Sequence, residues 1–195
     1  MAAKIGAGIA LVVMLTATCD SMVGPEDIAY VMVTPASWSP TALGDTIQFT
    51  AVAKSAFGKV IPVPVTWTTE PAGVVSVHED GVGIAQSPGA AQVHATVGGV
   101  MGTGNVHVTQ TIESVVILTY FGNQLAVGDS LMLYVDARDR NDFSVPGAKF
   151  SIQSLNPSIA TVSLEGWIKG KATGEVSIVA MSAGKVDTAG FVIIP

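Results

Sequence analysis

The stretch GDTIQF at residues 44–49 returns as GDSLML at residues 128–133, which is 84 positions later in the chain. A second pair, VHEDG at residues 77–81 and VSLEG at residues 162–166, keeps almost the same spacing, 85 positions. A fixed offset between similar segments indicates one supersecondary unit that is used twice. The fold is therefore expected to reside in a unit of about 85 residues.

The alignment of the two copies continues toward the end of the chain, because GAAQVHA at residues 89–95 matches GEVSIVA at residues 174–180. A chain of 195 residues is long enough for two small domains, each with its own hydrophobic core. We therefore expect two tandem domains, residues 25–110 and residues 111–195, behind an N-terminal segment of residues 1–24.

Composition favours strands and turns over helices in both units. Only 12% of the residues are charged, 21 are Gly and 10 are Pro, and Val, Thr and Ile occur in short runs. The alternation of apolar and polar residues predicts seven strands in the first unit, which the second unit repeats. The predicted strands of the first unit lie near residues 28–34, 46–54, 63–69, 73–78, 82–86, 90–97 and 102–109. Short strands separated by turns are typical of a β-sandwich, so the expected fold class is all-β.

The motifs within the two units resemble those of one protein family. A Gly-Asp pair precedes the second strand of each unit, VTWT stands at residues 65–68, and Gly89 opens the penultimate strand of the first. In the second unit NPSIATVS occupies residues 156–163, and Ile152 stands where the family has a core Trp. These features resemble the bacterial immunoglobulin-like domain of group 2, found in tandem on intimin- and invasin-type adhesins and in many exported proteins. The resemblance implies two tandem immunoglobulin-like β-sandwiches, with Trp67 in the core of the first.

The N-terminal segment has the length and composition of an export signal. Lys4 gives it a positive start, and the largely apolar run at residues 5–19 has 15 residues, fewer than the roughly 20 of a spanning helix. Its ending resembles a bacterial lipoprotein signal, which implies a lipid anchor on Cys19, although Thr16 and Thr18 depart from that pattern. An uncleaved signal anchor is the alternative. Both interpretations predict an exported, membrane-anchored protein, periplasmic or at the cell surface.

The sequence contains no recognisable catalytic, cofactor or nucleic-acid site. No nucleophile is accompanied by the His and carboxylate that would activate it, and the single cysteine, Cys19, lies in the N-terminal segment. The formal net charge of -6 and nine scattered Lys and Arg residues disfavour a nucleic-acid partner. We therefore expect no enzyme activity, no cofactor and no small-molecule substrate.

Two groups of residues carry a weaker suggestion of metal binding. If the last two strands of the first unit turn near Val100 and Met101, His94 and His107 lie nearly opposite each other and point outward. Two imidazoles do not complete a site, so we interpret both as exposed histidines. The stretch DARDRND at residues 136–142 interleaves arginines that would oppose a calcium ion, and we interpret it as a solvated loop paired with itself. No metal site is predicted.

The outward-facing positions of the two units differ in polarity. Positions that are polar in the first unit, such as Thr50 and His107, are apolar in the second. A cluster of exposed apolar side chains usually marks a surface that a partner covers, whereas a strand shifted in phase would put the same residues in the core. The predicted interface residues are Met132, Tyr134, Val179, Met181, Val192 and Ile194, and Trp38, Tyr120, Phe121 and Trp167 are candidates to extend the surface.

These patterns favour a binding or scaffolding role. The leading hypothesis is a non-enzymatic accessory subunit, tethered by its N-terminus, whose second domain docks on a larger membrane protein complex at its periplasmic face. A respiratory, secretory or photosynthetic reaction-centre complex would each fit. The alternative is a cell-surface adhesion or carbohydrate-binding module, which the family resemblance favours.

Overall fold

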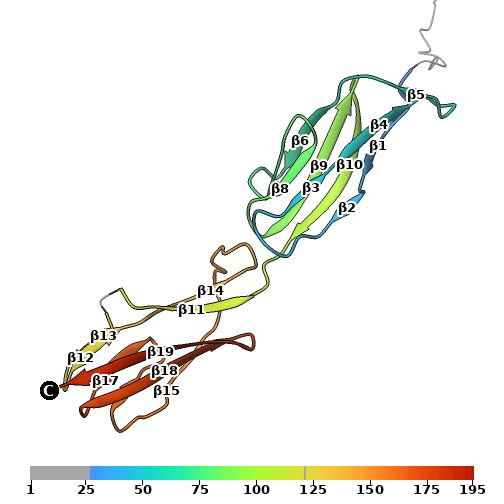
Figure 1. Ribbon diagram of the computed structural model, residues 1–195. Helices are drawn as coiled ribbons and strands as arrows, with labels where there is room; N and C mark the ends of the chain where they lie inside the picture. Colours follow the sequence, from blue (N-terminus) through green and yellow to red (C-terminus); the bar gives the residue numbers. More distant parts are fainter. Residues whose placement is uncertain (1–26, 121) are drawn as a thin grey trace, which may run out of the picture.

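The computed structural model describes residues 27–120 and 122–195. Cys19, the predicted site of the lipid anchor, and the whole N-terminal segment 1–24 lie outside the described residues, as does Phe121. The described chain forms two groups of sheets that follow one another, joined between β10 (Val100–Val108) and β11 (Ser114–Leu118) (Figure 1). Most strand pairs are antiparallel, and one short edge strand in each group pairs in parallel. The predicted all-β class with two tandem sandwiches is confirmed.

The first sandwich has two facing layers. One layer is the sheet β2-β10-β9-β6, and the other combines the sheets β1-β4-β5 and β3-β8-β7, because β3 and β4 are parts of one strand interrupted at Phe49. Its strands are β1 (Tyr30–Thr34), β2 (Ser37–Trp38), β3 (Thr46–Gln48), β4 (Thr50–Lys54), β5 (Val60–Ile61), β6 (Thr66–Glu70), β7 (Val75–Val77), β8 (Val82–Ala85), β9 (Gly89–Val97) and β10 (Val100–Val108).

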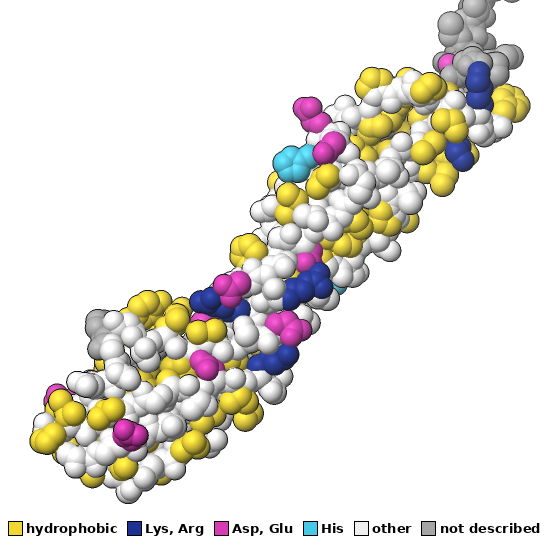
Figure 2. All heavy atoms as spheres, viewed as in Figure 1, with side chains coloured by type: hydrophobic (Ala, Val, Ile, Leu, Met, Phe, Trp, Pro, Cys, Tyr) yellow, Lys and Arg dark blue, Asp and Glu magenta, His cyan; other side chains and the backbone are white. Residues whose placement is uncertain are grey.

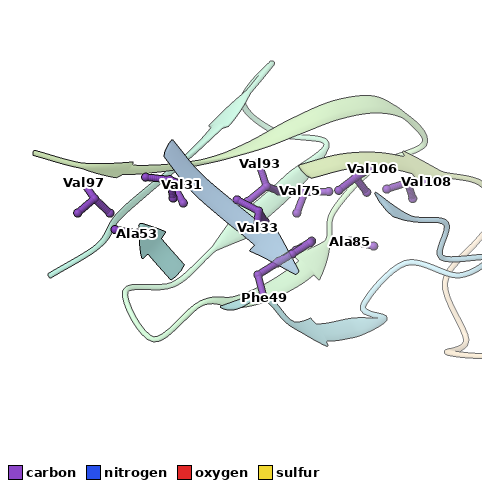
Figure 3. Close-up of a cluster of buried hydrophobic side chains, with 11 residues drawn as sticks. Val31, Val33, Phe49, Ala53, Val75, Ala85, Val93, Val97, Val106 and Val108 are labelled. Carbon is purple, nitrogen blue, oxygen red and sulfur yellow. The ribbon is translucent and has the colours of Figure 1, made fainter. Parts of the chain in front are cut away.

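Phe49 is part of the first core, together with valines of its own layer, such as Val33 and Val75, and valines of the facing sheet, such as Val93 and Val106 (Figure 3). The rings of Trp38 and Trp67 contact it from two sides, each with a centroid 6.2 Å from the Phe49 centroid. Burial of a Phe side chain contributes about 1.5–3 kcal/mol to stability. Trp67, which the family resemblance placed in the core, is half-buried and packs against this cluster.

The second sandwich repeats the first. Its layers are β12-β19-β18-β15 and the combination of β11-β14 with β13-β17-β16, where the shared strand is interrupted at Leu133, the counterpart of Phe49. Phe191, Ile168 and Ile178 fill its core, and Ile152 packs against them. Its strands are β11 (Ser114–Leu118), β12 (Gln124–Ala126), β13 (Ser130–Met132), β14 (Tyr134–Arg138), β15 (Ser151–Ser154), β16 (Ala160–Val162), β17 (Trp167–Gly170), β18 (Gly174–Ser182) and β19 (Lys185–Ile194).

The hairpin between β9 and β10 corrects the predicted position of the histidines. It turns at Gly98 and Gly99, whose φ angles of 56° and 84° fit a two-residue type I′ turn, and not near Val100 and Met101. The resulting register places His94 opposite Thr103 and His107 opposite Ala90, so the histidines are not paired. The prediction that both are exposed is also wrong for His94, which is buried with its Nδ1 3.0 Å from the Thr103 hydroxyl oxygen.

Candidate functional site

Charged side chains of both sandwiches meet at the joint between them. Figure 2 shows acidic and basic side chains gathered over this junction, while the surfaces of both sandwiches are largely uncharged in the same view. The connecting segment 109–113 contains no strand. The joint is therefore built by side chains and by single backbone hydrogen bonds.

The connecting segment is attached to the first sandwich by two threonines. The backbone N–H groups of Thr109 and Thr111 donate to the carbonyl oxygens of Pro40 and Thr41, each over 3.0 Å. Both hydroxyl groups donate to the same carbonyl oxygens over 3.2 Å. Four hydrogen bonds thus fix the direction in which the chain leaves the first sandwich.

The first sandwich offers the turn Leu43-Gly44-Asp45 to the second. Gly44 has a φ angle of 75°, a left-handed conformation that residues with a Cβ rarely adopt. A Cβ atom at this position would also lie 3.1 Å from Cε2 of Phe143, which belongs to the second sandwich. The absence of a side chain at Gly44 therefore allows the two sandwiches to approach closely.

Asp139 is the central residue that the second sandwich contributes. Its carboxylate is buried and accepts four hydrogen bonds. Oδ2 accepts from the backbone N–H of Leu43 and from Nε2 of Gln110, both over 2.9 Å. Oδ1 accepts from the N–H groups of Asn141 and Phe143 over 3.0 and 3.1 Å. One side chain thus connects the first sandwich, the connecting segment and its own loop.

Arg140 and Asn141 complete the joint from the same loop. Arg140 donates through Nε, over 3.2 Å, and through Nη2 to the two carboxylate oxygens of Asp45. Asn141 Nδ2 donates to the carbonyl oxygen of Leu43 over 2.7 Å and to Asp45 Oδ1 over 2.9 Å. Bidentate arginine–carboxylate contacts fix geometry as well as distance, so this pair restricts rotation between the sandwiches.

The two carboxylates of the joint, those of Asp45 and Asp139, both favour their charged form. Burial by itself raises the pKa of Asp45, but hydrogen bonds from Arg140 and Asn141 and the charge of Arg140 outweigh it, and the pKa lies below its ordinary value. Burial likewise raises the pKa of Asp139, and the hydrogen bonds from Gln110, Leu43, Phe143 and Asn141 together lower it below its ordinary value. The joint is thus assembled around two ionised carboxylates.

The predicted self-paired loop is right for one half of the stretch 136–142 and wrong for the other. Arg138 donates to Asp136 over 3.1 Å and to both oxygens of Asp142 over 2.9 and 3.0 Å, within the loop. The three residues between Arg138 and Asp142 instead contact the first sandwich. Sequence reasoning missed this because the partner turn at residues 43–45 is almost a hundred positions away.

Comparison of the two repeats could have indicated the joint from the sequence alone. The corresponding loop of the first sandwich makes the same turn, since Ser55 N donates to the Lys59 carbonyl oxygen over 2.9 Å as Asp139 N donates to that of Phe143. That loop has Ser55, Ala56 and Phe57 where the second has Asp139, Arg140 and Asn141. The backbone turn therefore forms without charged residues in the first sandwich. The charged residues of the second sandwich must serve a contact other than this turn.

The six predicted interface residues do not form one surface. Met132 and Tyr134 alternate with buried Leu133 on the strand β13–β14 and point outward from one layer of the second sandwich. Val179, Met181, Val192 and Ile194 point outward from β18 and β19, in the opposite layer. The alternation places all six on the outside, and Val179 and Val192 are only half-exposed.

The first of these two surfaces is the more aromatic. Trp167 pairs with Met132 across β13 and β17, and the ring of Tyr120 lies 6.3 Å from that of Tyr134. We call Tyr120, Met132, Tyr134 and Trp167 the aromatic face, and each of them is at least 44% exposed. Trp38, the other candidate extension, belongs to the first sandwich and is not part of this surface.

Two searches of the described residues, one for clustered metal ligands and one for helices that could cross a membrane, found none. No three His, Cys, Asp or Glu side chains within residues 27–120 and 122–195 are grouped so that they could hold a metal ion. The described chain also contains no helix with the length and apolarity needed to cross a bilayer.

Comparison with known proteins gives similarity in structure only. No protein-family model and no curated protein matches the chain. It is similar to domains 1–6 of the surface layer protein SbsC, with a TM-score of 0.43 and 20% identity, over 86% of this chain and 28% of that one. It is also similar to the Escherichia coli adhesin FdeC, with a TM-score of 0.47 and 19% identity, over 88% of this chain and 65% of that one.

A third similar structure is the Yersinia pseudotuberculosis adhesin InvE, with a TM-score of 0.42 and 14% identity, over 85% of this chain and 58% of that one. The chain thus spans between about a quarter and two thirds of these three proteins. At these identities the likeness concerns the immunoglobulin-like sandwich fold alone, and a shared fold does not by itself define a function.

Proposed function

We propose that the chain is a non-enzymatic structural and adhesive module of an exported surface protein. In this proposal its two sandwiches, residues 25–110 and 111–195, are group 2 bacterial immunoglobulin-like domains that act as one stiff rod. The N-terminal segment tethers the rod to a membrane, through a lipid on Cys19 or as an uncleaved anchor. The second sandwich presents a binding surface at the far end.

The cross-domain joint is the observation that supports this proposal. Asp45, Arg140 and Asn141 form hydrogen bonds between the sandwiches, and Asp139 ties both to the connecting segment. Hydrogen bonds to a buried charged group such as Asp139 contribute about 1.5–3 kcal/mol each. The pair of Asp45 with the exposed Arg140 adds mainly a fixed geometry. A chain that needed only a flexible tether would not require this set of contacts.

The surface of the second sandwich supports the adhesive part. The aromatic face exposes Tyr, Trp and Met, which are enriched in protein–protein contacts. The same exposure favours a second candidate function, in which this face docks on a larger membrane protein complex at its periplasmic side. The joint suits both functions, because each requires the face to be held away from the tether.

The two candidates differ in where the second sandwich is accessible. We would add a membrane-impermeant protease or antibody to intact cells that carry the full chain, with and without permeabilisation of the outer membrane. Exposure on intact cells, with loss of adherence when Tyr134→Ser is introduced, supports the adhesive module. Exposure only after permeabilisation, with a stoichiometric membrane complex in mild detergent, contradicts it and favours docking.

The Tyr134→Ser substitution has a matched control in the first sandwich. Thr50 aligns with Tyr134 and is exposed at the equivalent place of the first sandwich, so Thr50→Ser changes a surface residue outside the aromatic face. We expect Thr50→Ser to leave adherence or co-purification unchanged. Equal effects of both substitutions would contradict a role of the aromatic face in either function.

A further inference from the structure

One loop in each sandwich lies at the end where the chain enters that sandwich. In the second sandwich it is residues 139–143, and Arg138 just before it lies opposite Ser114 at the start of β11. In the first it is residues 55–59, and Lys54 just before it lies opposite the start of β1. Each loop is therefore close to the part of the chain that precedes its own sandwich. We call these two segments the entry loops.

The entry loop of the second sandwich binds what precedes it, the first sandwich. Asp139, Arg140 and Asn141 form hydrogen bonds with the turn at residues 43–45. The entry loop of the first sandwich makes the same backbone turn, so the shared fold presents it in the same direction. It is thus placed to contact whatever precedes the first sandwich, and its side chains indicate the kind of surface that they fit.

The tip of the first entry loop is an exposed aromatic ring. Phe57 is 80% exposed, and its backbone N–H donates to the hydroxyl oxygen of buried Ser55 over 3.3 Å, which holds the tip in a defined conformation. The equivalent residue of the second loop is Asn141, so the turn itself does not require an apolar side chain here. An exposed ring that the fold does not demand favours a surface that something covers.

Exposed apolar side chains continue from this loop onto the outer surface of the sheet β1-β4-β5. Lys54 lies between Tyr30 on one side and Val60 on the other, and Met32 lies opposite Val52 on the same surface. Paired residues of neighbouring strands point to the same face, and the residues that alternate with these on β1 and β4 point into the core. We call Tyr30, Met32, Val52, Phe57 and Val60 the entry patch, and all five are exposed.

The only Lys and Arg residues between positions 27 and 110 accompany this patch. They are Lys54 and Lys59, at the two ends of the first entry loop, and Asp27 offsets part of their charge. Figure 2 shows basic and hydrophobic side chains next to each other at the end of the first sandwich that lies away from the joint. This combination fits the interfacial region of a bilayer, because apolar groups enter between the headgroups while lysines reach their phosphates.

The predicted tether keeps this end of the first sandwich near a membrane. The apolar run ends at Cys19, eight positions before Asp27, and a chain spans at most about 3.6 Å per residue, so Asp27 remains within about 30 Å of the bilayer. This limit is the same for a lipid on Cys19 and for an uncleaved anchor. The N–H of Ala29 donates to the Lys54 carbonyl oxygen over 2.8 Å, which connects the start of the described chain to the patch.

We propose that the entry patch contacts the surface of the membrane that carries the tether, at anionic phospholipid headgroups. Phe57 enters the interfacial region, and Lys54 and Lys59 lie against the phosphates. The inference rests on the tether of the proposed function and goes beyond it, because a tether alone leaves the rod free to tilt, whereas a second contact restricts the tilt. The membrane then has the same relation to the first entry loop as the first sandwich has to the second.

The test places a tryptophan at the tip of the first entry loop. The full chain and its variant Phe57→Trp are reconstituted in vesicles of phosphatidylethanolamine and phosphatidylglycerol, with brominated or ordinary acyl chains. Bromine quenches tryptophan emission only at close range. The matched control is Leu164→Trp, because Leu164 is 83% exposed but belongs to the second sandwich. We expect only Phe57→Trp to lose emission in the brominated vesicles, while the parent chain and Leu164→Trp emit equally in both.

Flotation of the same vesicles distinguishes the tether from the contact. A parent chain that does not float with the vesicles would contradict both. Flotation without loss of emission from Phe57→Trp would overturn the contact alone. Vesicles of phosphatidylcholine alone should reduce the loss, and an equal loss would contradict binding to anionic headgroups. A dimer in detergent that Phe57→Ser abolishes would assign the entry patch to a second copy of the chain and overturn the proposal.

Discussion

Asp139 connects three parts of the molecule through a single side chain. Its four hydrogen bonds come from Leu43 of the first sandwich, from Gln110 of the connecting segment and from its own loop. Because the carboxylate is buried, a partner left without it would lose a hydrogen bond that water does not easily replace. The energetics of the joint are thus concentrated in a few residues.

Two glycines at equivalent positions allow the effect of contact at the joint to be distinguished from the effect of backbone strain. Gly44 and Gly128 occupy equivalent turns with φ angles of 75° and 94°, so Ala at either position should cost about 1–2 kcal/mol of stability. Only at Gly44 does a Cβ also meet the other sandwich, at Phe143. We expect thermal unfolding to report similar destabilisation for both variants, while only Gly44→Ala alters the interdomain geometry in small-angle X-ray scattering. Identical scattering of the two variants would contradict the close approach at Gly44.

At the scale of elements, the long hairpins determine the register of each sandwich. β9 and β10 pair over their whole length around Gly98-Gly99, and β18 and β19 do so around Ala183-Gly184, where both residues again have positive φ angles of 48° and 78°. Turns of this type match the right-handed twist of the strands that they join. The turn residues thus decide which side chains lie opposite each other on the sheet face.

Substitution in the first hairpin turn should show this directly. Gly99 has open space around it, so Gly99→Val adds no clash and its cost, of about 1–2 kcal/mol, comes from the left-handed backbone alone. Gly99→Asn should be better tolerated, because Asn adopts this conformation more readily. Urea denaturation of the full chain measures both. A loss for Asn equal to that for Val would contradict a type I′ turn at this position.

The sequence was sufficient for the long strands and insufficient for contacts between distant segments. Alternation over nine residues identified β9 and β10, whereas the two-residue strands β2 and β5 are too short to show a period. The predicted turn was wrong by two positions, because Gly98-Gly99 alone form the turn and Val100 and Met101 already belong to β10. Arg140 acts in the joint through its contact with Asp45. No local sequence pattern connects two positions so far apart in the chain.

At the scale of the whole molecule, the joint makes stiffness depend on pH. The pKa values of Asp45 and Asp139 lie below their ordinary values in the folded protein. Groups with a depressed pKa contribute stability that is complete above the ordinary carboxyl pKa, about 4, and is lost as the pH falls through the folded value. The rod should therefore stay stiff from neutral pH down to about pH 4 and loosen in more acidic solution.

Scattering curves of the full chain between neutral and acidic pH would measure this loosening. The control is the double variant Asp45→Asn, Asp139→Asn, which lacks the two titrating groups. We expect its interdomain geometry to vary little with pH and to resemble that of the parent chain in acid. A parent chain as stiff in acid as at neutral pH, with both sandwiches folded, would show that the carboxylates do not hold the joint.

Whether the two sandwiches act as one stiff rod can be measured as a distribution of distances between them. Spin labels on exposed Thr66 of β6 and Lys169 of β17, in a full chain with Cys19→Ala, report the distance between the sandwiches by pulsed electron resonance. We expect one narrow peak for this chain and a clearly broader distribution after Arg140→Ala and Asn141→Ala are added. A distribution already as broad before those substitutions as after them would contradict a stiff rod.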